Sequence, residues 1–123
     1  MDKKIIIAGI LLAIVFVSAC SGPKVDYSEF SKCLTMKDVK MYGAYWCSSC
    51  AEQKKLFGDS FKYVAYVECA VRGSSAQLAT CRESKIENYP TWEFADGSRA
   101  VGLLSIAELS SKSGCELPLE VTS

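Results

Sequence analysis

Cysteine is the residue type that most limits what this chain can fold into. The 123 residues include seven cysteines and no histidine. So many cysteines in a short chain indicate either an oxidising compartment, in which disulfides form, or a metal cluster. The lack of histidine excludes Ser-His-Asp and Cys-His catalytic sites and every zinc site with a histidine ligand. The cysteines are therefore the first candidates for any chemistry.

Composition and charge narrow the class of protein further. The chain is 50% hydrophobic, which is enough apolar content for one small buried core. Lys and Arg number 14, and Asp and Glu also number 14, so the chain lacks the basic excess of a nucleic-acid-binding module. We expect one small globular domain that is a monomer and has no nucleic-acid partner.

The N-terminus has the pattern of an export segment. Two lysines precede residues 5–19, which carry no charge and are too few for a membrane span of about 20 residues. The sequence Val17-Ser18-Ala19-Cys20 resembles the bacterial lipobox, which implies that Cys20 is acylated and becomes the new N-terminus. The alternative is a non-lipidated signal or an uncleaved anchor in which Cys20 is incidental. In each case we expect the domain outside the cytoplasm, in the periplasm or anchored to the outer face of the cell membrane.

These features divide the chain into four parts. Residues 1–19 are expected to be a signal peptide of the lipoprotein type, and residues 20–26, with Gly and Pro but no periodicity, a tether. A folded domain is expected over residues 27–117. Residues 118–123 are left as a C-terminal tail.

Hydrophobic periodicity and cap residues predict the elements of that domain. In chain order they are a helix from Tyr27 with Asp26 or Ser28 as its N-cap, a buried strand over 39–46, a helix over 48–57, a strand over 61–69, a helix from Ser74 or Ser75 to about Lys85, a hairpin of strands 91–95 and 98–103, and a helix from Ser105 to about Gly114. A β-α-β start requires a parallel pair with a right-handed crossover, and the hairpin adds antiparallel strands. The prediction is an α/β fold with a mixed four-stranded sheet and helices on both faces.

The motif Trp46-Cys47-Ser48-Ser49-Cys50 lies where the first strand passes into a helix. Unpaired backbone N–H groups and the helix dipole at this end favour the thiolate form of Cys47, which predicts that Cys47 is the nucleophile. Cys50 lies one turn further on the same side and is predicted to resolve the mixed disulfide. A Cys-x-x-Cys motif alone is weak evidence, because zinc knuckles also contain it.

The surrounding sequence resembles the thioredoxin-fold family over about residues 37–114. Trp46-Cys47-x-x-Cys50 matches the active site of that family, and Tyr89-Pro90-Thr91 matches its cis-proline loop. The resemblance implies that Pro90 is cis beside the active-site cysteines and that the Tyr89 backbone pairs with a substrate strand. The Trp46 ring suits a platform that faces the substrate, although core packing is the alternative for both Trp46 and Tyr45.

A narrower resemblance is to the thioredoxin-like domain fused to, or partnered with, bacterial vitamin K epoxide reductase homologues. It is carried by the segments 42–47, 52–58, 66–69 and 89–93. The resemblance implies disulfide exchange with a membrane quinone reductase.

The sequence departs from the thioredoxin pattern at two places that affect proton transfer and the reduction potential. Met41 stands where many cytoplasmic thioredoxins have a buried Asp, and Ser48-Ser49 replaces the Gly-Pro or Pro-His dipeptide. Without a histidine in the dipeptide, we expect a less stabilised thiolate than in strongly oxidising periplasmic enzymes. The direction of electron flow stays open.

Four further cysteines remain, and they allow three pairings. We favour Cys69–Cys81, because Cys69 ends a strand and Cys81 lies in the next helix. We also favour Cys33–Cys115, because the two residues bracket the domain near termini that tend to lie close together. Both bridges are expected to be structural, with electron relay to Cys47 and Cys50 as an alternative role for Cys69–Cys81.

These observations favour an exported, lipid-anchored thiol-disulfide oxidoreductase that exchanges disulfides with protein thiols or disulfides and needs no cofactor or metal. One alternative is a zinc site made of Cys47, Cys50, Cys69 and Cys81, although the spacing of the second pair is unlike a zinc ribbon. Another is a redox-inert interaction module on a thioredoxin scaffold.

Overall fold

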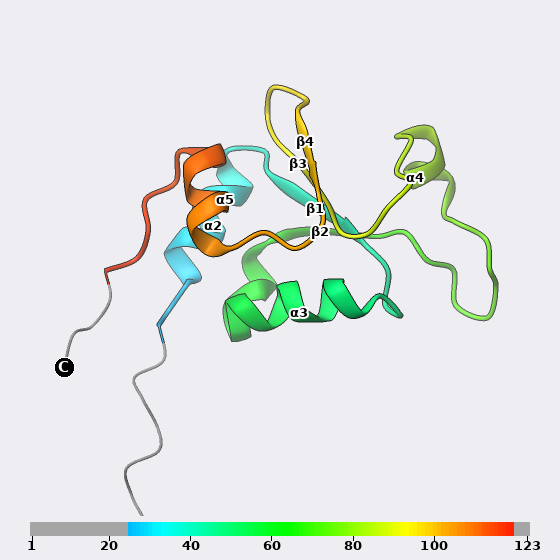
Figure 1. Cartoon of the computed structure of the whole chain (residues 1–123), viewed down its shortest axis with the longest axis horizontal. Coiled ribbons are helices and arrows are strands. Elements are labelled where there is room, and N and C mark those ends of the chain that lie inside the picture. The colour runs from blue at the N-terminus through cyan, green and yellow to red at the C-terminus, as the bar shows by residue number, and fades with distance from the viewer. Residues whose placement is uncertain (1–24, 120–123) are drawn as a thin grey trace, which may run out of the picture.

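The centre of the structure is a mixed four-stranded sheet (Figure 1). The structure is a computed structural model that describes residues 25–119. The strands, in the spatial order β2-β1-β3-β4, are β1 (Lys40–Gly43), β2 (Ala65–Glu68), β3 (Thr91–Glu93) and β4 (Arg99–Val101). β1 pairs in parallel with β2 and antiparallel with β3, with Met41 opposite Trp92. β3 and β4 form the antiparallel hairpin.

Helices pack on both faces of this sheet. They are α2 (Ser28–Met36), α3 (Ser48–Phe57), the 3-10 helix η2 (Gly58–Tyr63), α4 (Ala79–Glu83) and α5 (Ile106–Ser113). Met41 and Trp92 are cross-strand neighbours on one face and belong to the same cluster as Phe57 of α3. Because side chains alternate along a strand, Tyr42 points to the opposite face, where it packs with Cys81 of α4. The sheet therefore separates α3 from α4.

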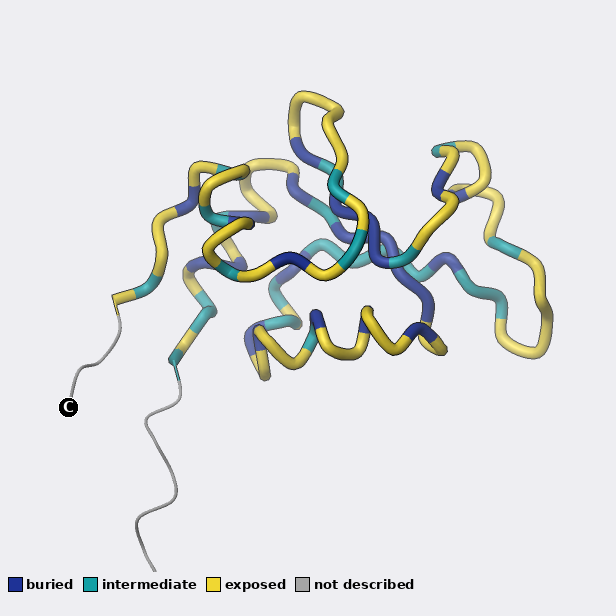
Figure 2. Tube along the Cα trace, in the orientation of Figure 1, coloured by how far each residue is buried: buried dark blue, intermediate teal, exposed yellow. Residues whose placement is uncertain are grey.

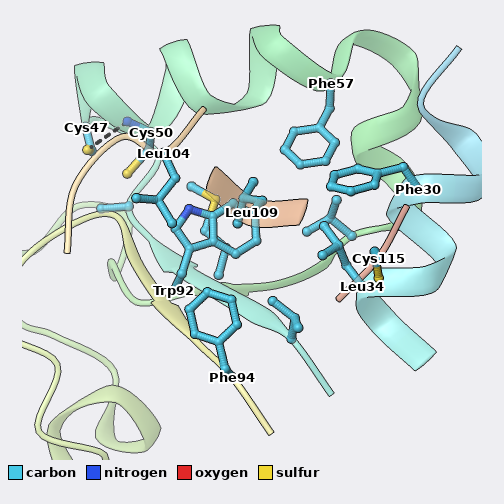
Figure 3. Packing of buried hydrophobic residues seen from close by; sticks show 14 residues of the cluster. Phe30, Leu34, Cys47, Cys50, Phe57, Trp92, Phe94, Leu104, Leu109 and Cys115 are labelled. Atoms are coloured by element: carbon cyan, nitrogen blue, oxygen red, sulfur yellow. Dashed lines mark hydrogen bonds between the residues drawn. The ribbon is translucent and has the colours of Figure 1, made fainter. Parts of the chain in front are cut away.

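Most of the buried apolar side chains form one cluster, which we call the large cluster (Figure 3). Its members are Phe30, Leu34, Val39, Met41, Ala44, Cys47, Cys50, Phe57, Val64, Trp92, Phe94, Leu104, Leu109 and Cys115. The Phe57 ring lies 6.3 Å from that of Phe30 and 6.1 Å from that of Trp92, measured between ring centres. These aromatic contacts join α2, α3 and β3 into one core.

Among residues 25–119, the buried polar residues are Ser31, Gln53, Ser60 and Thr91, and Gln53 is the largest of them. Gln53 of α3 is fully buried. Its amide nitrogen donates to the Leu104 carbonyl at 2.9 Å, and its oxygen accepts from the Trp92 indole N–H at 3.1 Å and from the Leu104 N–H at 2.8 Å. A buried amide is costly unless it is paired, and here every partner lies outside α3. These bonds therefore hold α3, which begins at the two cysteines, against β3 and the segment before α5.

A second, much smaller group of buried residues lies on the other face of the sheet. This small cluster consists of Tyr42, Cys69, Cys81 and Ile86. The loop over residues 70–78, which leads from β2 to α4, is largely exposed (Figure 2). The part of the chain around α4 therefore has little apolar packing of its own.

The fold class predicted from the sequence is confirmed as a thioredoxin-like fold with a mixed four-stranded sheet and helices on both faces. The bounds of α3 are those predicted, and Gly58 ends it. The capping box at the start of α5 is present, with Ser105 as N-cap and Glu108 as its partner. Gly114 ends α5 in the left-handed conformation at φ 79°, which glycine adopts without steric cost.

All four predicted strands are longer than the observed ones, and the two of the hairpin, predicted over 91–95 and 98–103, span only Thr91–Glu93 and Arg99–Val101. The strand over 39–46 ends at Gly43, because the Tyr45 N–H donates to the Glu68 side chain at 2.6 Å and the Cys47 N–H turns back to the Ala44 carbonyl at 3.0 Å. The strand predicted over 61–69 begins only at Ala65, because its first residues belong to η2. The aromatic ring of Phe61 packs there on Phe57, at 5.8 Å between ring centres. The aromatic residues at the start of this segment therefore pack against a helix, although their pattern in the sequence indicated a strand.

The helix predicted from Ser74 or Ser75 to Lys85 is limited to Ala79–Glu83. The chain before it forms an isolated bridge between Ala70 and Gln77, and the Leu78 N–H donates to the Cys69 carbonyl at 2.8 Å. These bonds use backbone groups that a longer helix would need. At α2 the N-cap position is Tyr27, and Asp26 instead accepts the Ser28 N–H at 2.9 Å.

The signal peptide over 1–19, Cys20 and the tether up to residue 24 lie outside the described residues, as do residues 120–123 of the tail. Between residues 25 and 119, no helix is long and apolar enough to cross a membrane.

Candidate active site

The N-terminus of α3 holds the Cys47 sulfur. Cys47 is the N-cap residue, with extended backbone at φ −80° and ψ 119°, and its Sγ accepts the Cys50 backbone N–H at 3.1 Å. A sulfur in this position takes the place of the oxygen of an ordinary capping side chain. Negative charge on the sulfur would be stabilised by this N–H and by the helix dipole. The geometry therefore suits Cys47 for reaction as a thiolate.

Cys50 has a different environment, although its sulfur is in the same part of the molecule (Figure 3). It is 1% exposed, whereas Cys47 is 9% exposed. Burial, followed by the hydrogen bond with Cys47, raises the pKa of the Cys50 thiol to about 12. Cys50 therefore stays protonated at neutral pH until a reaction step removes its proton.

The loop before β3 closes the other side of Cys47. The Tyr89-Pro90 peptide bond is cis. The Cys47 thiol donates a hydrogen bond to the Tyr89 carbonyl oxygen, at 3.6 Å. The Pro90 carbonyl accepts the Gly102 N–H at 2.8 Å. The Tyr89 hydroxyl accepts from the Gln77 side chain at 2.7 Å. Tyr89 and Pro90 thus lie beside the reactive sulfur, where the sequence placed them.

Trp46 is on the surface next to Cys47. Trp46 is 64% exposed, and its ring meets the Tyr89 ring edge-on at 5.7 Å between centres. A pocket of about 320 Å³ lies beside the two rings, and its lining residues are Trp46, Cys69, Ala70, Ser74, Ser75, Ala76, Gln77 and Tyr89. Trp46 is therefore available to an incoming chain and takes no part in the core.

Tyr45 is also outside the core, with 44% of its surface exposed. The Arg72 guanidinium lies 4.4 Å from the centre of its ring, within the range of a cation–π interaction. This contact ties the start of the exposed loop over 70–78 to the turn that carries Cys47.

Two polar residues that the sequence motifs did not identify lie close to the cysteines. Tyr66 and Glu68 lie two positions apart on β2, so they share one face, and the Tyr66 hydroxyl donates to a Glu68 carboxylate oxygen. Burial raises the pKa of Tyr66 well above its usual range, and the Glu68 carboxylate adds to this effect. The alternation of two polar residues on a strand beside a Cys-x-x-Cys segment was a signal in the sequence that could have identified them.

The four other cysteines of residues 25–119 are joined in two disulfides. Cys33 pairs with Cys115, with a Cα–Cα distance of 6.0 Å, and Cys69 pairs with Cys81, at 5.7 Å. Both pairings match those favoured from the sequence. Because the sulfurs of Cys69 and Cys81 are bonded to each other, the structure does not assemble the four-cysteine zinc site.

No group of three or more cysteine, aspartate or glutamate side chains within the described part of the chain is arranged to hold a metal ion. Cys47 and Cys50 are free cysteines. The fold and site together define a thioredoxin-like domain with a Cys-x-x-Cys pair at the start of a helix, next to a cis-proline loop.

Comparison with known proteins agrees with this class. No protein-family model matches the chain. The chain is 40% identical over 105 residues to the thiol-disulfide oxidoreductase LTO1 of Arabidopsis thaliana. The match covers 82% of this chain but only 27% of LTO1, so the chain spans about a quarter of the length of that relative.

Proposed function

We propose that this protein is a thiol-disulfide oxidoreductase that acts on protein thiols or disulfides through Cys47 and Cys50. The observation that carries the proposal is the asymmetry of the pair. The Cys47 sulfur accepts a helix N-terminal N–H, whereas Cys50 is buried as a thiol. The similarity to LTO1, an oxidoreductase by name, supports the same activity.

The reaction consists of two exchanges. In the first, the Cys47 thiolate attacks one sulfur of a substrate disulfide, and the other substrate sulfur leaves as a thiolate with the electron pair. In the second, Cys50 loses its proton and attacks the Cys47 sulfur. The Cys47–Cys50 bond forms, and the attached substrate sulfur leaves as a thiolate. The protein pair is oxidised by two electrons and the substrate disulfide is reduced, and the reverse sequence oxidises a substrate dithiol.

In this proposal the substrate chain lies across the exposed Trp46 ring and the Tyr89-Pro90 backbone. The pocket beside Trp46 and Tyr89 would take a side chain close to the substrate cysteine. Its wall is made partly by the exposed loop over 70–78, which can adapt to different side chains. This arrangement supports protein substrates rather than a small disulfide alone.

We also propose that the protein is exported and anchored by lipid at Cys20, and that a membrane disulfide-forming enzyme of the vitamin K epoxide reductase type is its redox partner. The uncharged segment over 5–19 and the motif before Cys20 support the anchor. The sequence resemblance supports the partner. Intact-mass analysis of membrane-bound protein should show an acylated N-terminal Cys20, and a free Met1 or a cleaved, lipid-free chain would contradict the anchor.

The roles of the two sulfurs can be tested with two serine variants. Cys50→Ser should still attack but cannot resolve, so covalent complexes with substrates or the membrane partner should accumulate and dissolve in strong reductant. Cys47→Ser should trap almost none. Non-reducing gels of both variants make the comparison, with Ser49→Ala as a control that alters neither sulfur. If neither cysteine variant traps a partner, or if Cys50 is alkylated faster than Cys47 in the reduced protein, the proposed mechanism is wrong.

A further inference from the structure

The resolving step needs a group that takes the proton of Cys50. The pKa of this thiol is about 12 because of burial, and only the thiolate attacks a disulfide. Met41, which is buried on the neighbouring strand, has no oxygen or nitrogen in its side chain that could accept the proton. The acceptor must therefore come from another element.

Among the residues that the structure describes, few titratable groups are available around Cys50. They are Cys47 and Lys54 from α3, Tyr66 and Glu68 from β2, and Tyr89 from the loop before β3. Cys47 is consumed in the mixed disulfide, Lys54 is a cation without an acceptor, and the Tyr89 hydroxyl is engaged with Gln77. Only the Tyr66 and Glu68 pair remains.

Gly43 allows Tyr66, the member of this pair that carries the hydroxyl, to approach Cys50. A Cβ atom at residue 43 would lie 3.1 Å from the Tyr66 hydroxyl oxygen and 3.2 Å from the Cys50 sulfur. It would lie 2.9 Å from Tyr66 Cε2, closer than real Cβ contacts. The sulfur and the hydroxyl therefore border the same space, which a residue with a side chain would fill.

The Tyr66 hydroxyl already donates to Glu68. The raised pKa of Tyr66 keeps it a neutral phenol, which can accept one proton while it donates another. The second oxygen of Glu68 accepts the Tyr45 N–H at 2.6 Å, so the carboxylate is held in place, and its partial exposure lets a proton pass on to solvent. Lys54 Nζ lies 4.2 Å from the centre of the Tyr66 ring and adds positive charge near the forming thiolate.

We propose that Tyr66 and Glu68 form the proton path for Cys50. This inference rests on the proposed oxidoreductase function. As Cys50 attacks the Cys47 sulfur, its proton passes to the Tyr66 oxygen, and the Tyr66 proton passes to the Glu68 carboxylate. The Cys47–Cys50 bond forms, the substrate sulfur leaves as a thiolate with the electron pair, and Glu68 ends as a neutral acid. In the reverse reaction, the same path returns a proton to Cys50 as it leaves.

The two exchanges can be timed separately with 5,5′-dithiobis(2-nitrobenzoate) and the reduced protein. One coloured thiolate is released when Cys47 attacks the reagent, and a second is released when Cys50 attacks the mixed disulfide. Tyr66→Phe and Glu68→Gln should leave the first release within about twofold of the wild-type rate. They should slow the second release about 100-fold at neutral pH, since positioned proton transfer contributes roughly that much.

The pH profile separates a proton path from a structural role. Without the path, hydroxide must remove the Cys50 proton, so the second release in both variants should rise about tenfold per pH unit below the pKa of Cys50. The wild-type protein should show a shallower rise. Tyr63→Phe is the matched control, because it removes a tyrosine hydroxyl from η2 and should leave both releases unchanged.

Two kinds of failure are distinguishable. If Cys47→Ser still gives the first release at the wild-type rate, the proposed function itself fails. If Cys47→Ser abolishes it but Tyr66→Phe and Glu68→Gln resolve at the wild-type rate and slope, the proton path is overturned while the function stands. Equal slowing of both releases would also overturn the path, because it would indicate a general distortion of the site.

Discussion

The large and small clusters keep their parts of the chain folded by different means. The large cluster joins α2, α3, α5 and the sheet through stacked aromatic rings and the buried Gln53 bonds. The small cluster has four buried residues, and two of them are the bonded pair Cys69 and Cys81. Where apolar area is scarce, a covalent bond replaces it, as in many small exported domains.

The active site lies on the border between the two clusters. Cys47 and Cys50 belong to the large cluster, whereas Cys69 lines the pocket beside Trp46. Tyr89 packs against both clusters. The reactive sulfurs are thus held by the well-packed side, and the surface offered to a substrate is held by the side that depends on its disulfide.

Loss of the Cys33–Cys115 disulfide should have the largest effect on global stability. It closes a sequence separation of 82 residues, and the chain-entropy model gives about 4.5 kcal/mol for a loop of that length. Cys33→Ala with Cys115→Ala should lower the free energy of unfolding by about that amount, while unfolding stays cooperative because the large cluster still packs. Urea unfolding followed by Trp92 fluorescence measures this, in a Trp46→Phe background that removes the exposed indole.

A loss below about 1 kcal/mol, or a transition in two stages, would contradict the comparison. A transition in two stages would mean that the large cluster does not unfold as one unit. A small loss would mean that the Cys33–Cys115 bridge adds little to its stability. Ala replacements of both cysteines are required, because a single replacement leaves a free thiol that can exchange with Cys47.

Loss of the Cys69–Cys81 disulfide should cost less in total but concentrate its effect locally. Its sequence separation is 12 residues, for which the same model gives about 3 kcal/mol. In Cys69→Ala with Cys81→Ala, amide hydrogen exchange should accelerate over residues 70–86, whereas β1 and β3 should keep their protection. Hydrogen exchange read by mass spectrometry gives the segment-by-segment comparison.

Equal acceleration in β1, β3 and residues 70–86 would show that the small cluster has no separate stability. Differential alkylation of the wild-type protein adds a second criterion. A structural bridge should persist in mild reductant that opens Cys47–Cys50. If Cys69–Cys81 opens together with the active-site pair, the electron-relay role is favoured over the structural one.

The two clusters also differ in how far the sequence predicted them. The helix over 48–57 and the capping box at Ser105 depend on local signals, namely spacing, caps and a terminal glycine, and both were predicted with their bounds. The helix before Lys85 was predicted too long. The start of this helix depends on the bridge between Ala70 and Gln77 and on the hydrogen bond from the Leu78 N–H to the Cys69 carbonyl. Both contacts form only in the folded chain.

The residues of the site also divide into those that local motifs identify and those that depend on contacts in the folded chain. Cys47, Cys50, Tyr89 and Pro90 stand in short motifs, so the sequence identified them and placed them together. Tyr66 and Glu68 were not assigned, because their role depends on the register of β2 against β1, which places Glu68 opposite Gly43. Gly43 has no turn or positive φ to indicate its importance, and only the approach of Tyr66 and Cys50 to its missing side chain explains it.

A smaller effect, on the pH dependence of stability, should distinguish the cysteines of the two clusters. Cys50 can titrate, whereas Cys69 and Cys81 are locked in a disulfide. Burial raises the pKa of Cys50 to about 12 in the folded protein, above about 8.5 for an unfolded thiol. Because the folded pKa is the higher one, the stabilisation is fully present below about pH 8.5 and is lost as pH rises toward 12.

The comparison is cleanest without Cys47. Between about pH 7.5 and pH 9.5, Cys47→Ala should lose about 1 kcal/mol more stability than Cys47→Ala with Cys50→Ala, a figure that allows for solvent screening at this edge of the core. Urea unfolding at a series of pH values measures both proteins, and every other titrating group cancels in the difference. Parallel curves would mean that Cys50 ionises as easily in the folded protein as in the unfolded chain. Its attack on the mixed disulfide would then need no proton acceptor. This small difference in slope therefore also tests whether Cys50 needs the proton path through Tyr66 and Glu68.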